Sequence, residues 1–147
     1  MPLPTFGRLA PNATLTLIVV DASAIVDWLI TTFERGAAVV EEVRKVSALH
    51  TLDFADLEVM SGLRRRVARG ELDEPRASEA LEDFAIIRMR RHRASPFRRR
   101  IWELRHNHTP YDAAYLALAE ALDMPLLTTD SRLARSGGHR ARIIEAQ

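Results

Sequence analysis

The stretch Leu15-Thr16-Leu17-Ile18-Val19-Val20-Asp21 is an apolar, β-branched run that ends directly at a carboxylate. Such a run is typical of a strand that is buried on both faces of a parallel sheet. A second run of this kind, residues 126–129, is also followed at once by an acid, Asp130. Ligands of open α/β sheets bind at the carboxyl ends of the strands. The sequence therefore places Asp21 and Asp130 at the functional edge of a sheet.

Beyond these strands, the spacing of apolar residues predicts helices along most of the remaining chain. Their predicted ranges are 22–30, 34–48, 53–69, 75–89, 96–105, 110–122 and 130–134, with a closing edge strand at 142–144. Gly70 suits the position after the third helix, and Pro75 and Pro110 suit first turns. Short apolar strands separated by helices predict an α/β fold, with a central parallel sheet flanked by α-helices.

The length of 147 residues and the apolar content of 47% fit one domain with an ordinary core. We expect this domain to span residues 15–147, after an N-terminal arm of residues 1–14 whose prolines discourage regular structure. The absence of cysteine excludes disulfides, thiolate metal sites and cysteine nucleophiles. No segment is long and apolar enough for a membrane span or a signal peptide, so a cytoplasmic location is expected.

The net charge of +1 conceals two opposed halves. Residues 1–87 carry 9 basic and 14 acidic side chains, whereas residues 88–147 carry 12 basic and 6 acidic ones. Of the 21 basic residues only Lys45 is a lysine, and eight arginines fall between Arg88 and Arg105. Codon use in a GC-rich genome accounts for part of this arginine excess. Its clustering indicates an anionic partner, because a guanidinium binds phosphate well.

Four acids are candidate functional residues: Asp21, Glu58, Asp112 and Asp130. Each also has a structural explanation, since the three aspartates can cap or begin helices and most surface glutamates are simply solvated. Together, two strand ends and two helices can deliver four carboxylates to one cleft. Carboxylates a few Å apart repel each other by roughly 4 kcal/mol per pair at an effective dielectric of about 20. Four ionised carboxylates in one cleft therefore need a cation between them. Oxygen ligands without cysteine or histidine favour Mg²⁺ or Mn²⁺.

Several other chemistries lack their residues in this chain. A receiver domain needs a lysine late in the chain, and a haloacid-dehalogenase-type phosphatase needs an aspartate where Ser23 stands. The glycine patterns of phosphate-binding and dinucleotide-binding loops are absent, as is the nucleophile elbow of serine hydrolases. A metal-filled acidic cleft beside arginines instead suits a phosphodiester substrate. We expect Trp102 and Tyr111 to lie in the core rather than to form a stacking platform.

Four segments resemble the PIN-domain nucleases, especially VapC-type toxins of the actinobacterial and mycobacterial branch. Val19-Val20-Asp21-Ala22-Ser23-Ala24 is similar to their first strand and first acid, and Thr109-Pro110-Tyr111-Asp112 opens a helix similar to that of their third acid. Leu126-Leu127-Thr128-Thr129-Asp130 is similar to their fourth-acid segment, and the helix that carries Glu58 is similar to that of the second. The resemblance covers about residues 17–145.

This resemblance implies a PIN fold and a Mg²⁺- or Mn²⁺-dependent endoribonuclease. It implies that Asp21, Glu58, Asp112 and Asp130 bind the metal and form the catalytic site, with Ser23 and Thr129 as supporting hydroxyls. It also implies a cognate VapB-type antitoxin, a toxin homodimer and a hetero-oligomer of the two proteins. Arginines near the cleft are expected to hold the RNA backbone, with Arg98, Arg99, Arg100 and Arg105 as the candidates.

Two alternatives remain open on the sequence alone. The chain could be a non-catalytic RNA- or protein-binding module on a PIN fold, although the presence of all four acids argues against a degenerate site. It could also be a nuclease of the same fold that is directed at DNA. Parallel digestion of RNA and single-stranded DNA separates these possibilities.

Overall fold

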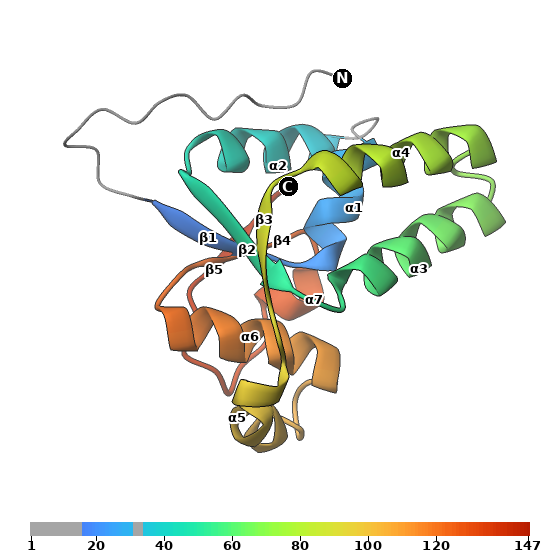
Figure 1. The fold of residues 1–147 in the computed structure, drawn as a ribbon. Helices are drawn as coiled ribbons and strands as arrows, with labels where there is room; N and C mark the ends of the chain where they lie inside the picture. Colours follow the sequence, from blue (N-terminus) through green and yellow to red (C-terminus); the bar gives the residue numbers. More distant parts are fainter. Residues whose placement is uncertain (1–15, 31–33) are drawn as a thin grey trace.

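The structure is a computed structural model that describes residues 16–30 and 34–147. Its centre is a five-stranded sheet in the order β3-β2-β1-β4-β5, and all four strand pairs are parallel (Figure 1). The strands are β1 (Leu17–Val20), β2 (Ala48–Leu52), β3 (Met89–His92), β4 (Leu126–Thr128) and β5 (Ile143–Glu145). The central parallel sheet predicted from the sequence is thereby confirmed.

Helices cover both faces of this sheet (Figure 1). One face carries α1 (Ala22–Ile30), α2 (Glu34–Arg44), α3 (Ala55–Ala68) and α4 (Glu74–Ile86). The other carries the short 3-10 helix η1 (Ser95–Phe97), α5 (Arg98–Glu103), α6 (Pro110–Leu122) and α7 (Ser131–Ala134). In the described part of the chain, no helix is long and apolar enough to cross a membrane.

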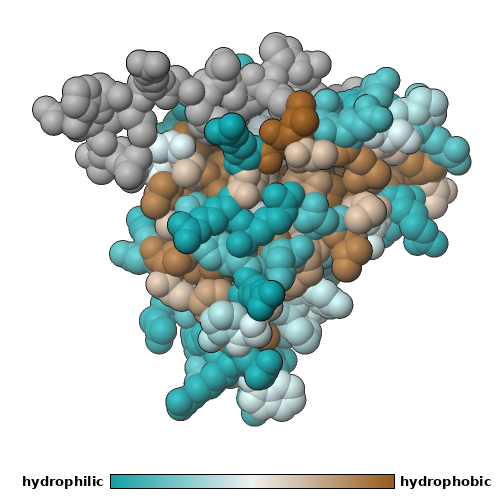
Figure 2. Space-filling model, viewed as in Figure 1, coloured by the Kyte–Doolittle hydropathy of each residue, from teal (hydrophilic) through white to brown (hydrophobic). Residues whose placement is uncertain are grey.

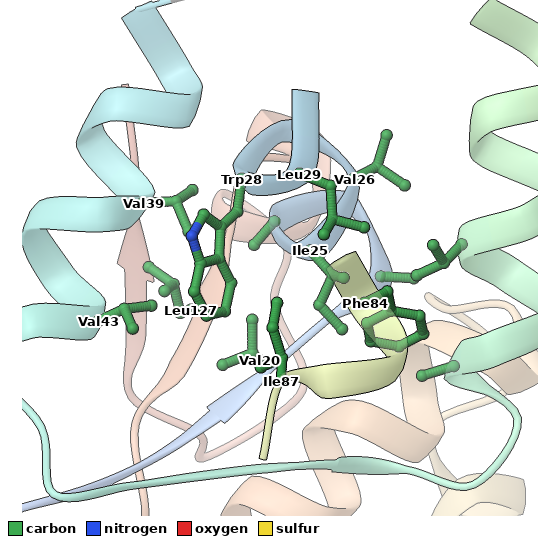
Figure 3. Close-up of a cluster of buried hydrophobic side chains, with 14 of the residues drawn as sticks. Val20, Ile25, Val26, Trp28, Leu29, Val39, Val43, Phe84, Ile87 and Leu127 are labelled. Carbon is green, nitrogen blue, oxygen red and sulfur yellow. The ribbon is translucent and has the colours of Figure 1, made fainter. Parts of the chain in front are cut away.

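The central strands contribute to a separate core on each face, because alternate side chains of a strand point to opposite sides. Ile18 and Val20 of β1 join the core under α1 to α4, whereas Val19 joins the core under α6. Trp28 of α1 lies fully buried in the first core, beside Val39 on α2 and the sheet residue Leu127 (Figure 3). This two-sided burial explains why β1 and β4 read as continuous apolar runs.

Two strands were missed by the predictions from sequence. The helix predicted over residues 34–48 ends at Arg44, and Ala48 begins β2, which pairs with β1 and β3. Val46 continues the helical spacing of Val39 and Val43, so the periodicity extends past the true helix end. The helix predicted over residues 75–89 ends at Ile86, and Met89 begins β3. This edge strand, Met-Arg-Arg-His, has no apolar pattern that distinguishes it from a loop.

The helices predicted over residues 22–30 and 110–122 are observed with these ends, and the remaining predicted elements are observed with shifted ends. Residues 96–105 divide into η1 and α5, and the strands predicted at 126–129 and 142–144 are β4 and β5. Gly70 follows α3 with a φ of 70°, the left-handed conformation that glycine adopts without strain. The predicted arm of residues 1–14 and the domain start at residue 15 lie outside the described residues.

The expectation that Trp102 and Tyr111 belong to the core is wrong, since their exposed fractions are 67% and 56%. Each belongs to a surface helix: Trp102 lies under the guanidinium of Arg105, and Tyr111 lies edge-on to Phe54. Hydrophilic side chains lie over β3 and at the α5 end of the molecule, and apolar side chains are exposed on either side of β3 (Figure 2).

Candidate active site

The candidate site is a cleft of about 520 Å³, and Asp21, Glu58, Asp112 and Asp130 all line it. β1 lies in the middle of the sheet, between β2 and β4. From β1 the chain adds β2 and β3 on one side and then β4 and β5 on the other, so the order of strand addition reverses at β1. In parallel α/β sheets this reversal opens a crevice at the carboxyl ends of the strands. Asp21 directly follows β1, and Asp130 lies two residues beyond the end of β4. α3 and α6 supply Glu58 and Asp112.

Asp21 is the innermost carboxylate, with an exposed fraction of 5%. Its Oδ1 accepts hydrogen bonds from Ser23 Oγ at 2.7 Å and from the Ala24 backbone N–H at 2.9 Å. Its Oδ2 accepts a hydrogen bond from Thr128 Oγ1 at 2.5 Å. Burial raises the pKa of Asp21 to about 6, because desolvation outweighs these three donors, and Asp112 adds repulsion. A positive charge placed in the cleft would stabilise its ionised form.

Glu58 is held by Tyr115, whose hydroxyl donates to Glu58 Oε1 at 2.9 Å. Burial raises the pKa of Glu58, and the charges of Asp21 and Asp112 raise it further. Tyr115 is 2% exposed, and its own pKa is raised by burial and by the neighbouring carboxylates, so it remains a donor. The charges of Glu58 and Asp21 therefore interact directly, although the two residues come from different elements.

The other two acids begin helices. Asp112 lies in the first turn of α6, where its backbone N–H donates to Thr109 Oγ1 at 3.2 Å, as the predicted Thr-Pro-Tyr-Asp cap requires. Burial and then Asp130 raise the pKa of Asp112. Asp130 caps α7, and its Oδ1 accepts from the N–H of Arg132 at 2.9 Å. Both acids thus have the structural roles anticipated from sequence and still face the cleft.

The donor set of the cleft fits a hard divalent cation. It consists of carboxylate oxygens, and burial and mutual repulsion disfavour the ionised forms of Asp21, Glu58 and Asp112. Among residues 16–30 and 34–147, no three His, Asp or Glu side chains are already grouped tightly enough to coordinate one ion. Hydrogen bonds to the protein hold three of the carboxylates instead, those of Asp21, Glu58 and Asp130. Side-chain rotation would have to bring them together around an ion.

Of the two predicted supporting residues, Ser23 lies beside Asp21, and Thr129 lies beside Ser23. Ser23 contacts Asp21 directly, and the backbone N–H of Thr129 donates to Ser23 Oγ at 3.2 Å. Reasoning from sequence missed Thr128, whose hydroxyl donates to Asp21 and accepts from the Asp130 N–H at 3.0 Å. It also missed Tyr115, which follows Asp112 by three residues and so lies on the same side of α6. That helical spacing was the available signal.

None of the four arginines predicted to bind RNA lines the cleft. Arg100 donates to both carboxylate oxygens of Glu120, at 2.8 and 3.0 Å, and Glu120 lies about 12 Å along α6 from Asp112 at 1.5 Å per residue. Arg99 pairs with Glu103, and Arg105 packs on Trp102. The arginines that do line the cleft are Arg35, Arg65, Arg66, Arg69 and Arg132.

Comparison with known proteins agrees with this arrangement of the sheet and helices. The family model for the PIN domain matches residues 18–138, which include all four acids. The chain therefore belongs to the PIN-domain family.

Its relatives within this family are VapC ribonucleases. Ribonuclease VapC12 of Mycobacterium tuberculosis is 40% identical over 127 residues, which are 86% of this chain and 97% of the relative. The crystal structure of M. tuberculosis VapC20, described as a sarcin-ricin loop cleaving toxin, matches with a TM-score of 0.64 at 18% identity, over 84% of this chain and 96% of that one. VapBC2 of Rickettsia felis, solved on a DNA fragment from its promoter, matches with a TM-score of 0.59 at 10% identity, over 90% and 100%.

Proposed function

We propose that this chain is a metal-dependent endoribonuclease that hydrolyses RNA phosphodiester bonds in the acidic cleft, and that it is the toxin of a VapBC-type module. The observation that carries the proposal is the convergence of Asp21, Glu58, Asp112 and Asp130 from four separate elements on one cleft. The relationship to Ribonuclease VapC12, which spans nearly the whole of that relative, supports RNA as the substrate.

The residues of the cleft would have different roles in this reaction. Asp21, Asp112 and Asp130 would hold Mg²⁺ or Mn²⁺, with Glu58 completing the pocket. The ion would supply positive charge opposite the phosphate and make a water molecule more acidic. Glu58 is fixed by Tyr115 and has a raised pKa, so it is suited to orient that water and accept its proton. Ser23 and Thr128 hold the Asp21 carboxylate in one orientation.

Partners follow from the same family relationship. We propose a VapB-type antitoxin as the inhibitor, a homodimer of the toxin, and a hetero-oligomer of the two in the cytoplasm. The R. felis structure contains both VapB and VapC, which supports a paired antitoxin. Growth arrest on expression, relieved by a small protein encoded beside the gene, is the expected phenotype.

The test compares total RNA with single-stranded DNA as substrates for the purified chain, with Mg²⁺ and with EDTA. We expect cleavage of RNA only, lost in EDTA and lost in Asp21→Asn. Asp123→Asn is a matched control, because Asp123 is an exposed residue outside the cleft whose left-handed φ of 50° suits asparagine equally. Cleavage by Asp21→Asn at the rate of the control would overturn the proposal, and cleavage of DNA alone would reassign the substrate.

A further inference from the structure

One stripe of α3 leads away from the acids and carries two arginines. Glu58, Gly62, Arg65 and Arg69 are spaced by four, three and four residues, and all four line the cleft. Residues at this spacing lie on one side of an α-helix. At 1.5 Å per residue, Arg65 lies about 10 Å along the helix from Glu58, and Arg69 about 6 Å further.

Gly62 lets α3 pack closely against α1 between the acid and the first arginine. A Cβ atom at residue 62 would lie 2.8 Å from Val26 Cγ2. Gly62 and Val26 both line the cleft at this point of the stripe. The cleft therefore continues from the carboxylates towards the arginines.

Arg65 and Arg69 differ from their neighbour Arg66 in what they bind. Arg66 is half-buried and pairs with Asp27 at 2.6 Å and with Glu71 at 3.5 Å, so its charge is used within the fold. Arg65 and Arg69 are exposed, and neither forms an ion pair with any carboxylate in residues 16–30 and 34–147.

We propose that Arg65 and Arg69 bind neighbouring backbone phosphates of the RNA on one side of the cut, so that the strand runs along α3 from the acidic site. The inference rests on the proposed function for its substrate and extends it to the path of the strand. Two exposed guanidinium groups one helical turn apart provide a fixed pair of phosphate ligands. Such contacts position the strand and carry no base preference.

The arginine-rich segment of residues 88–105 uses part of its positive charge within the protein. Arg100 pairs with Glu120, and Arg99 pairs with Glu103. Arg91 likewise pairs with Asp56 at 2.9 Å. Arg65 and Arg69, in contrast, lie in the cleft and have no such carboxylate partner in the described part of the chain.

The experiment measures RNA affinity with a matched pair of variants. Arg65→Gln and Arg64→Gln remove the same charge from adjacent residues of α3, but Arg64 faces the separate groove between α3 and α4. Each is placed on the full-length Asp21→Asn background, in EDTA, with a fluorescein-labelled single-stranded RNA of mixed sequence as the probe. Fluorescence anisotropy gives Kd at several salt concentrations, and a gel confirms that the RNA stays intact.

We expect Arg65→Gln and Arg69→Gln to weaken binding about two- to fivefold each, as for exposed ion pairs. Each should also reduce the salt slope of log Kd by about 0.7, the value for one phosphate contact on a single strand. Arg64→Gln should change neither quantity. Equal effects of Arg64→Gln and Arg65→Gln, or no effect of Arg65→Gln and Arg69→Gln, would overturn the inference.

Failure of this inference can be distinguished from failure of the proposed function. If the wild-type chain cuts no RNA with Mg²⁺ but Arg65→Gln still loses affinity selectively, the endonuclease proposal fails and the path along α3 stands. If the wild-type chain cuts RNA and Arg65→Gln binds and cuts like Arg64→Gln, the path fails and the endonuclease proposal stands.

Discussion

Thr128 donates its hydroxyl hydrogen to Oδ2 of Asp21, and this bond joins the ends of the two central strands β1 and β4. The strand register pairs Val20 with Leu127, so Thr128 comes to lie beside Asp21. The same oxygen of Thr128 accepts the N–H of Asp130. One buried hydroxyl therefore fixes two acids of the cleft relative to each other.

We predict that Thr128→Val destabilises the protein by about 1–3 kcal/mol at neutral pH, because it leaves a buried carboxylate without one of its donors. Urea unfolding of the variant measures this loss. The same substitution on the Asp21→Asn background should cost less, and the difference in a double-mutant cycle isolates the contact. Equal costs on both backgrounds would show that the hydroxyl does not act through Asp21.

A second prediction concerns pH in the absence of divalent metal. The pKa of Asp21 is about 6 in the folded chain against 3.8 for an unperturbed aspartate, so the folded state binds more protons between these values. Stability contributed at Asp21 therefore falls as pH rises from about 4 to 6 and stays low above that. A shift of this size corresponds to about 3 kcal/mol at most, at 1.36 kcal/mol per pKa unit.

Asp21→Asn removes this titration, so its stability relative to wild type should increase by about 2–3 kcal/mol between pH 4 and pH 7 in EDTA. Urea unfolding at the two pH values measures the change. Asp123→Asn, which changes an exposed aspartate, should keep a constant difference from wild type. A constant difference for Asp21→Asn as well would show that Asp21 has an ordinary pKa.

We also predict that Mg²⁺ or Mn²⁺ stabilises the metal-free protein, because a cation relieves the burial and repulsion that raise the pKa values in the cleft. At a hundredfold excess over Kd, one site contributes about 2.7 kcal/mol. That corresponds to roughly 5–10 °C in Tm for a chain of this size. Thermal unfolding should show the shift in wild type and in Glu103→Gln, and little of it in Asp112→Asn. An undiminished shift in Asp112→Asn would place the ion elsewhere.

Tyr115→Phe tests the contact with Glu58. The variant keeps the buried ring and removes the hydroxyl that donates to Glu58 Oε1, so the pKa of Glu58 should rise further. We expect kcat for RNA cleavage to fall with KM little changed, and the acidic limb of the pH profile to move to higher pH. An unchanged pH profile would remove Tyr115 from the positioning of Glu58.

The strand–acid units could be predicted from sequence because they are local: an apolar run followed by Asp21 or Asp130 needs no knowledge of the partner strands. β2 and β3 could not, since helical periodicity continues into Ala48 and β3 contains Arg90 and Arg91. Both strands depend on pairing with a neighbour that is distant in sequence.

The candidate site could likewise be predicted only in part. The four acids follow from the resemblance and from their positions at element ends, but the role of Thr128 depends on the β1–β4 register. The choice of arginines near the cleft from sequence was wrong in its location, because it followed the high density of arginines in residues 88–105. Position in space points to Arg65 and Arg69, which are separated by one turn of a helix that also carries Glu58.

RNA cleavage in the acidic cleft can be tested in cells by mapping new RNA 5′ ends after brief induced expression of the wild-type chain and of Asp21→Asn. If the acidic cleft cuts RNA, a discrete set of new ends appears with the wild-type chain and is absent with Asp21→Asn at equal protein level. The same set of ends from Asp21→Asn, or no new ends from either chain, would contradict it.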